Sequence, residues 1–172
     1  MYFVHLTKPK KMTLNMTPTP VRCLILACGN TLRGDDGVGP WLAEWAENRF
    51  RSEPAIRIIS RHQLTPEFAE EIAASASVIL IDCSTASAPG SVSAVPVEPV
   101  VSSVALNPHH IGPAELLALA RDLYSSSPRE ALLLTIGAAS TELSEHPSDT
   151  VRSALPEACR LLEEAVRRLL QD

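Results

Sequence analysis

The segment that most constrains the fold is a turn rich in glycine and acid at residues 29–40, with the sequence GNTLRGDDGVGP. It follows residues 21–28, an apolar run typical of a buried strand, and precedes a helix-like pattern over residues 38–51. Open α/β sheets place their sites in the turns that follow the carboxyl ends of strands. The turn therefore predicts an α/β fold and a first candidate site, where glycines would let the backbone approach whatever the two acids bind.

Strand and helix patterns alternate along the rest of the chain. Apolar runs or alternating patterns predict strands at residues 21–28, 56–59, 77–81, 91–97 and 131–137. Helical periodicity predicts helices at residues 38–51, 65–74 and 148–170, with a further helix after residues 107–110. The alternation predicts a mostly parallel sheet covered on both faces, and Pro96 and Pro99 place the strand at 91–97 on an edge.

Within the helices, apolar spacing predicts which side chains face the core. For the helix at 38–51 the predicted face holds Val38, Trp41, Leu42, Trp45 and Arg49. For the helix after residue 110 it holds Leu116, Leu119, Ala120 and Leu123. For the last helix it holds Val151, Leu155, Leu162, Val166 and Leu169.

Length and charge limit the possible classes of protein. A chain of 172 residues suits one domain, which we expect to span residues 21–172. Residues 1–20 hold three lysines and three prolines without apolar periodicity, which predicts a flexible N-terminal extension. A net charge of -5 gives no reason to expect nucleic acid as a partner, and no apolar run is long enough to span a bilayer. The four cysteines show no close pairing, so we interpret them as reduced thiols of a cytoplasmic protein.

Three polar residues occupy positions at which such a sheet places its site. Asp36 follows the first strand, Asp82 ends the strand at 77–81, and His109 lies before a helix. If these strands are neighbours, two carboxylates and an imidazole converge and could bind a borderline divalent ion such as nickel or zinc. His62, after the second strand, is a further candidate imidazole.

Each candidate also has a purely structural interpretation. Asp35 or Asp36 could cap the following helix, because aspartate is a leading N-cap residue. His109 could be an ordinary surface histidine. Asp82 is the more suggestive acid, because a carboxylate after five apolar residues is costly unless it is paired or solvated in a cleft.

Several other chemistries lack their motifs. The turn does not supply the G-x-G-x-x-G fingerprint of dinucleotide binding, and the chain has neither a phosphate loop with G-K-[ST] nor a G-x-S-x-G elbow. A nucleophilic pair of Cys83 with His109 or His110 is conceivable, but no helix N-terminus is predicted beside the thiol to activate it.

Three sequence patterns of this chain together resemble those of the hydrogenase maturation proteases, peptidase family M52. They are G-N-x-L-x-x-D-(D/E)-G-x-G at the first helix, an acid that ends the third strand, and P-H before the third helix. The resemblance implies a three-layer α/β sandwich with a twisted, mostly parallel five-stranded sheet. It also implies an endopeptidase that removes a C-terminal extension from a [NiFe]-hydrogenase large-subunit precursor after nickel insertion.

The resemblance also implies roles for individual residues. Asp36, Asp82 and His109 match the nickel-recognising residues of the family, and Asp36 and Asp82 could also act as acid and base. The substrate supplies the nickel, for which zinc or cadmium could substitute. Where some members carry a glycine-rich segment for substrate recognition, this chain has residues 61–64, so we expect His62 and Gln63 to contact substrate.

Two other functions use the same residues. The chain could be a non-catalytic binder that checks nickel loading of the precursor, or a metallohydrolase for small molecules. Cleavage of a nickel-loaded precursor would separate the protease from the binder, while turnover of small esters or amides would favour the metallohydrolase.

Overall fold

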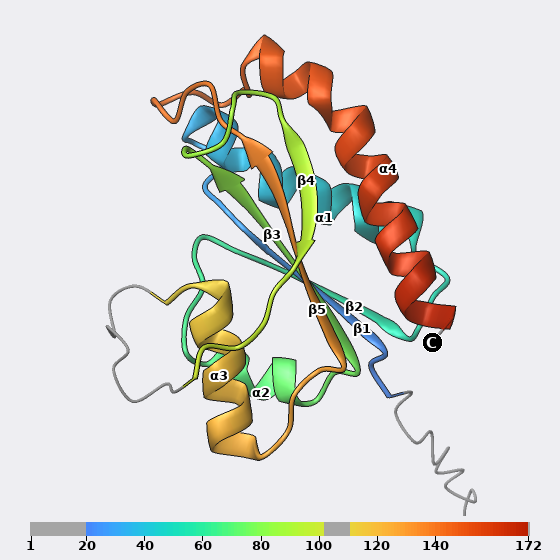
Figure 1. Ribbon diagram of the computed structural model, residues 1–172. Coiled ribbons are helices and arrows are strands. Elements are labelled where there is room, and N and C mark those ends of the chain that lie inside the picture. Colours follow the sequence, from blue (N-terminus) through green and yellow to red (C-terminus); the bar gives the residue numbers. More distant parts are fainter. Residues whose placement is uncertain (1–19, 102–110, 172) are drawn as a thin grey trace, which may run out of the picture.

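The computed structural model describes residues 20–101 and 111–171, and these residues form one five-stranded sheet with helices on both faces (Figure 1). Its strands are β1 (Cys23–Cys28), β2 (Ile56–Arg61), β3 (Ser77–Ser84), β4 (Val92–Pro96) and β5 (Glu130–Gly137). They lie in the order β2-β1-β3-β5-β4. All neighbouring pairs are parallel except β4 and β5, so the predicted antiparallel edge strand is confirmed.

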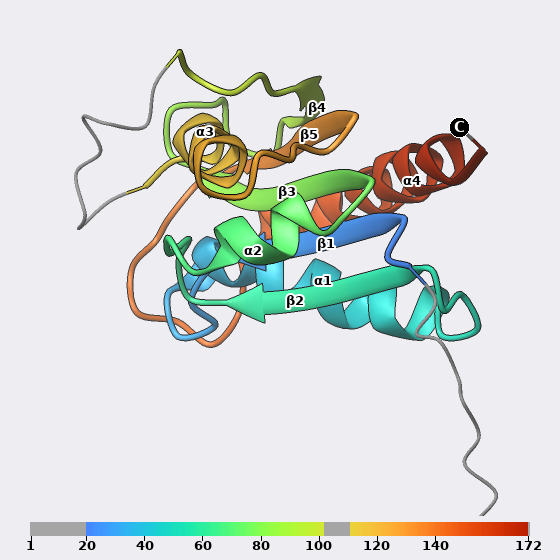
Figure 2. The same cartoon turned by 90° about the horizontal axis from the view of Figure 1, so that it is seen from below.

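Within the described part of the chain, two helices cover each face of the sheet. The helical segments are the 3₁₀ turn η1 (Gly34–Gly37), α1 (Val38–Arg49), α2 (Phe68–Ala73), α3 (Pro113–Tyr124) and α4 (Asp149–Gln171). Helices α1 and α4 pack on one face, and α2 and α3 on the other, as Figure 2 shows. The three-layer α/β sandwich expected from the sequence is therefore confirmed.

The central strands have two buried faces, which explains their continuous apolar sequences. In β1, Cys23, Ile25 and Ala27 pack toward α1 and α4, while Leu24 and Leu26 pack toward α2 and α3. All six residues of β1 are buried. No helix among the described residues is both long and apolar enough to cross a membrane.

Two of the predicted helix faces are wrong in part. In α1, Trp41 is 40% exposed and Arg49 is exposed, whereas Ala43 and Ala46 are buried. In α3, Leu123 is 63% exposed. All five inward residues predicted for α4 are buried, because this long helix has the clearest separation of apolar and charged residues.

Some predicted boundaries also differ from the structure. Strand β3 continues to Ser84, because Asp82, Cys83 and Ser84 still pair with β5. The second helix begins at Phe68, and its predicted first residues, Thr65 and Pro66, form a turn instead. The expected N-terminal extension lies outside the described residues, apart from Pro20.

Gly39 allows α1 to pack directly on the end of β1, so we expect a larger residue at this position to destabilise the protein. A Cβ at this position would lie 2.0 Å from the carbonyl oxygen of Cys28. We expect Gly39→Ala to lower the free energy of unfolding by about 2 kcal/mol, because neither backbone segment can yield easily. Urea unfolding at neutral pH would measure this loss. An unchanged midpoint would show that α1 can shift away from β1 at little cost.

Candidate functional site

A cleft with a volume of about 160 Å³ lies at the carboxyl ends of β1, β2 and β3. It brings together four of the residues that the sequence singled out, Asp36, Asp82, His62 and Gln63. Its lining residues are Cys28, Gly29, Asp36, His62, Gln63, Leu64, Asp82, Ile111, Gly112 and Pro113. The site is therefore assembled from the ends of three strands and the start of α3, as expected for this type of sheet.

Asp36 lies in η1 and is held by the turn that precedes it. Its Oδ2 accepts a hydrogen bond from the backbone N–H of Asn30 at 3.0 Å, and the Asn30 side chain accepts one from the N–H of Leu32 at 2.9 Å. The carboxylate is half-buried and lines the cleft. One oxygen thus fixes the orientation of the group, while Oδ1 has no hydrogen-bond partner among the described residues.

Asp82 is positioned by the central strand of the sheet. It pairs with Thr135 of β5, and its Oδ1 accepts a hydrogen bond from the N–H of Cys83 at 2.8 Å. Its side chain is half-buried and lines the same cleft as that of Asp36. One carboxylate from η1 and one from the end of β3 therefore line one hollow, which can attract a cation or a donor group.

Asp35 has a role that the sequence did not reveal. It is 0% exposed, and it accepts hydrogen bonds from the N–H groups of Ala139 (2.8 Å), Ser140 (2.9 Å) and Ser148 (2.6 Å). The hydroxyl of Ser148 donates a fourth bond at 3.0 Å. Burial alone would raise the pKa of this carboxyl group, but the bonds from Ser140, Ser148 and Ala139 lower it below its usual value. Asp35 thus ties η1 to the loop between β5 and α4.

These contacts correct the interpretation of the acidic pair as helix caps. Neither η1 nor α1 has a side-chain cap at its N-terminus. The nearest sequence signal for the role of Asp35 was Ser148, whose hydroxyl also accepts a bond from the N–H of Val151 in the first turn of α4. A serine before an amphipathic helix is a recognisable cap, but nothing in the sequence links it to a residue 113 positions away.

The glycines of the turn were expected to leave room for a partner. Gly29 does line the cleft, and the glycines are also needed for the packing of the turn itself. Gly29 has φ +143°, and a Cβ there would lie 1.9 Å from the carbonyl oxygen of Asp36. The added Cβ at Gly34 or Gly37 would likewise lie within 3.2 Å of the chain's own backbone. These glycines therefore allow the close internal packing of the turn.

The cysteines near the cleft are unsuited to nucleophilic attack. Burial, together with the charges of Asp82 and Asp36, raises the pKa of Cys28 to about 12. Burial and the charges of Asp36, Asp35 and Asp82 likewise raise the pKa of Cys83 to about 12. These shifts argue against Cys83 as a nucleophile, and all four cysteines are free of disulfides.

The raised thiol pKa values predict slow alkylation. With pKa values of about 12 for Cys28 and Cys83, the reactive thiolate forms would be scarce at pH 8. We expect iodoacetamide to modify these two residues at least about tenfold more slowly than an unperturbed thiol with a pKa of about 8.5. Mass spectrometry of timed digests would measure the rates. Rapid modification of Cys83 in the folded protein would contradict the electrostatic description of the site.

The third expected nickel-recognising residue, His109, lies outside the described residues, as does His110. Within the described part of the chain, no group of three His, Cys, Asp or Glu side chains is arranged to hold a metal ion. His62 and Gln63 are exposed at the cleft, so contact with substrate stays a prediction for both.

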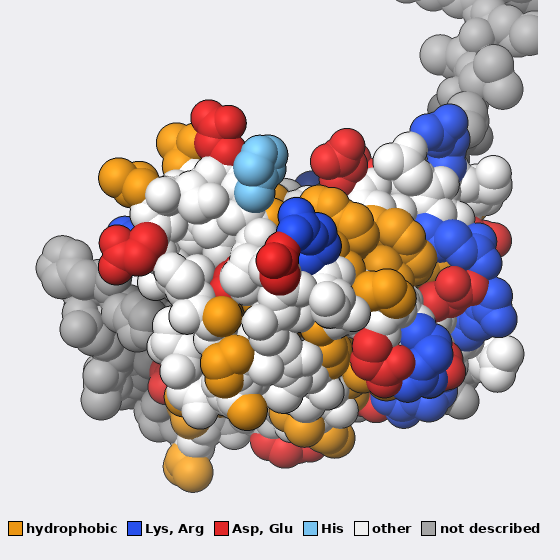
Figure 3. Space-filling model, turned by 90° about the horizontal axis from the view of Figure 1, so that it is seen from above, with side chains coloured by type: hydrophobic (Ala, Val, Ile, Leu, Met, Phe, Trp, Pro, Cys, Tyr) orange, Lys and Arg blue, Asp and Glu red, His pale blue; other side chains and the backbone are white. Residues whose placement is uncertain are grey.

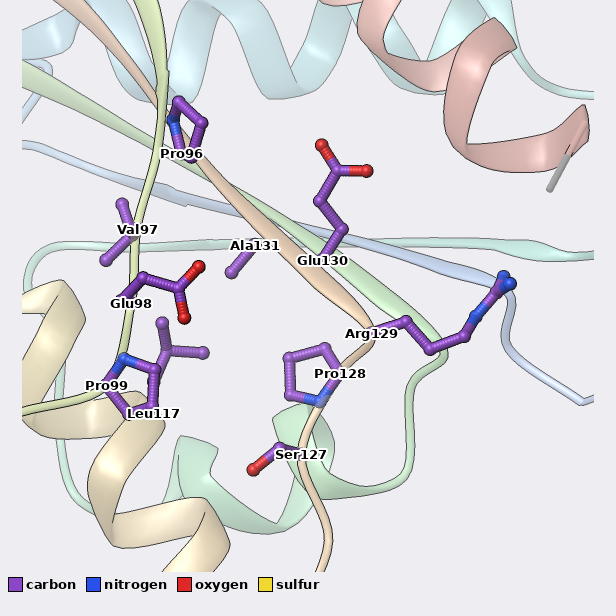
Figure 4. A pocket seen from close by; sticks show the side chains of 10 residues that line it. All are labelled: Pro96, Val97, Glu98, Pro99, Leu117, Ser127, Pro128, Arg129, Glu130 and Ala131. Atoms are coloured by element: carbon purple, nitrogen blue, oxygen red, sulfur yellow. The ribbon is translucent and has the colours of Figure 1, made fainter.

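A smaller pocket of about 70 Å³ lies at the opposite end of β5, beside β4 and α3 (Figure 4). Pro96, Pro99 and Pro128 form much of its wall, with Glu98 and Arg129 at its side. None of the candidate site residues that the structure describes lines this pocket.

Comparison with known proteins finds solved structures of similar fold. No family model and no curated protein matches the chain. The hydrogenase maturating endopeptidase HybD from E. coli superposes with a TM-score of 0.69 at 21% identity, over 86% of this chain and 93% of that one. The [NiFe] hydrogenase maturation protease HycI from Thermococcus kodakarensis gives 0.61 at 22% identity, over 88% and 94%.

A hydrogenase 2 maturation peptidase from a Thaumarchaeota archaeon is also similar. It has a TM-score of 0.58 and 25% identity, over 84% of this chain and 97% of that one. The resemblance inferred from sequence motifs is thereby confirmed at the level of the fold.

Proposed function

We propose that this chain, which has the fold of the hydrogenase maturation proteases, is an endopeptidase that matures a hydrogenase. Its substrate would be a nickel-loaded large-subunit precursor of a [NiFe]-hydrogenase, from which it removes a C-terminal extension. The observation that carries the proposal is the convergence of Asp36 and Asp82 on one cleft in this fold. The free cysteines are consistent with a cytoplasmic location.

The two carboxylates would recognise nickel that the substrate already holds. Thiolates bind nickel more strongly than carboxylates do, so Asp36 and Asp82 would add ligands to the ion without removing it from the precursor. The backbone bonds from Asn30 to Asp36 and from Cys83 to Asp82 fix one oxygen of each group. Such fixed orientation lowers the cost of binding, because the carboxylates need not be ordered when the ion arrives.

His109 would complete this set as an imidazole ligand, as the sequence motif implies. Ile111, two positions further along the chain, is buried and lines the cleft next to the first turn of α3. His62 and Gln63, which line the cleft, would contact the substrate polypeptide. In this proposal, recognition depends on nickel, because the ion connects enzyme and substrate.

The proposal is tested by incubating the protein with nickel-loaded precursor and measuring the mass of the large subunit. A shortened large subunit, absent when the precursor carries no nickel, would support it. A stable nickel-dependent complex with an intact C-terminus would favour a loading checkpoint instead. If the protein neither cleaves nor binds the precursor but hydrolyses small esters or amides, the result would favour a small-molecule metallohydrolase.

A further inference from the structure

A second pocket of about 160 Å³ lies on the other side of the turn that carries Asp36. Its wall is formed by the turn itself, by the first half of α1, by the loop that precedes α4 and by Leu155 of α4. The residues that line it are Thr31, Gly34, Gly37, Val38, Pro40, Trp41, Glu44, Glu145, Pro147 and Leu155. We call this the α1–α4 pocket. A cavity of about 150 Å³ holds benzene, so this one is large enough for an apolar side chain.

Large hydrophobic side chains are exposed around the α1–α4 pocket. Trp41, which lines the pocket, is 40% exposed. Leu32 follows the lining residue Thr31 and is 56% exposed. Leu143 lies two positions before the lining residue Glu145 and is 87% exposed. Figure 3 shows hydrophobic side chains gathered among charged ones on the end of the molecule where α4 begins. Apolar side chains exposed together are typical of interaction sites.

These side chains are held on a rigid support. The N–H of Gly34 donates to the carbonyl oxygen of Ser144 at 2.8 Å, and the N–H of Ser144 donates to that of Leu32 at 3.1 Å. The buried carboxylate of Asp35 joins the same two loops. The surface is therefore preorganised, and a partner that docks on it need not order these loops.

The pocket also has an acidic rim. Glu44 and Glu145 are exposed, and neither has an ion pair within the described part of the chain. By contrast, four arginines of α4 are already paired with glutamate or aspartate: Arg152, Arg160, Arg167 and Arg168. An apolar hollow flanked by two exposed carboxylates is complementary to an apolar side chain next to lysine or arginine.

We propose that the α1–α4 pocket docks such a segment of the large-subunit precursor, and that this second contact positions the precursor over the cleft. The inference rests on the proposed function. One turn forms both sites: Thr31 and Gly37 line the pocket, and Asp36 lines the cleft. A polypeptide held in the pocket is therefore close to the two carboxylates, and binding there adds affinity that does not depend on nickel.

A second copy of this chain is a less suitable occupant. The chain has a net charge of -5, so two copies repel at neutral pH. The arginines of α4 that could meet the acidic rim are engaged in their own ion pairs. Self-association through this surface remains an outcome that the experiment can detect.

The test compares two double variants in steady-state processing of nickel-loaded precursor. Glu44→Lys with Glu145→Lys reverses the charge of the rim. Glu47→Lys with Glu70→Lys makes the same change in net charge at exposed positions that do not line the pocket. We expect the rim variant to raise KM about tenfold with kcat within about twofold, while the control variant matches the wild type. Equal KM values for the two variants would overturn the proposal.

Two further measurements separate docking from catalysis and from self-association. Binding of precursor to Asp82→Asn protein, which we expect to be inactive, should weaken when the rim is reversed and should be unaffected by the control changes. Weaker binding of the rim variant alone would support docking, whether or not the wild type cleaves the precursor. Failure of the wild type to cleave the precursor would refute the proposed protease function but not the docking. A wild-type dimer in light scattering that Trp41→Ser converts to a monomer would overturn the choice of occupant.

Discussion

Asp82→Asn protein is expected to process the nickel-loaded precursor at least about a hundredfold more slowly than the wild type, since even residues that merely support metal ligands alter affinity or activity by tenfold or more. An amide is a much poorer ligand for a divalent cation than a carboxylate, and it also removes the negative charge that Asp82 adds to the cleft. The time course of large-subunit shortening, followed by mass spectrometry, would give the rate.

Two comparisons make this result specific to the site. The amide oxygen of asparagine can still accept the hydrogen bond from the N–H of Cys83, so the free energy of unfolding should change by less than about 1 kcal/mol. Asp149→Asn is the matched control, because this acid is exposed and lies at the start of α4, away from the cleft. Normal processing by the Asp82 variant would remove this carboxylate from the mechanism.

Asp35→Asn should have the largest effect on stability. Asparagine would present its amide NH2, itself a donor, to some of the four donors that now converge on the carboxylate, and the site is closed to water. We expect a loss of about 3 kcal/mol in the free energy of unfolding at pH 7, because buried donors would be left unpaired. Urea unfolding would measure this loss. Ser148→Ala, which removes one of the four donors and the cap of α4, should cost about 1 kcal/mol.

The effect of Asp35→Asn should also depend on pH. The folded pKa of Asp35 lies below its usual value of 3.8, so ionised Asp35 stabilises the protein above that pH, and this stabilisation is lost as pH falls through the folded value. The difference in unfolding free energy between wild type and variant should therefore narrow between pH 5 and pH 2. A difference that stays constant over this range would show that the charge of Asp35 contributes nothing.

The architecture was predictable from sequence because local signals agreed with tertiary packing. The apolar runs of β1 and β3 follow from burial on both faces, and the prolines around β4 follow from its place at an edge. Asp82 could be recognised because a carboxylate after five apolar residues is costly unless it is paired or solvated in a cleft, and Asp36 because it belongs to the acidic turn that follows β1.

Features that depend on contacts between distant segments could not be predicted in this way. Asp35 and Asp36 are adjacent and chemically identical, yet one lines the cleft and the other is buried against a loop more than a hundred residues away. Trp41 fitted the apolar period of α1 but borders a pocket instead of the core. Apolar periodicity indicates which residues of a helix could be buried. Which of them are buried depends on the segments that pack against the helix.

The strand order β2-β1-β3-β5-β4 determines where the cleft lies, independently of the side chains that line it. The connection from β1 to β2 contains α1, which lies on one face of the sheet. The connection from β2 to β3 contains α2, which lies on the other face. Adjacent strands whose connections leave toward opposite faces create a hollow between their carboxyl ends. The cleft is thus a product of topology, so substitutions in its lining would alter what is bound there while the hollow itself remains.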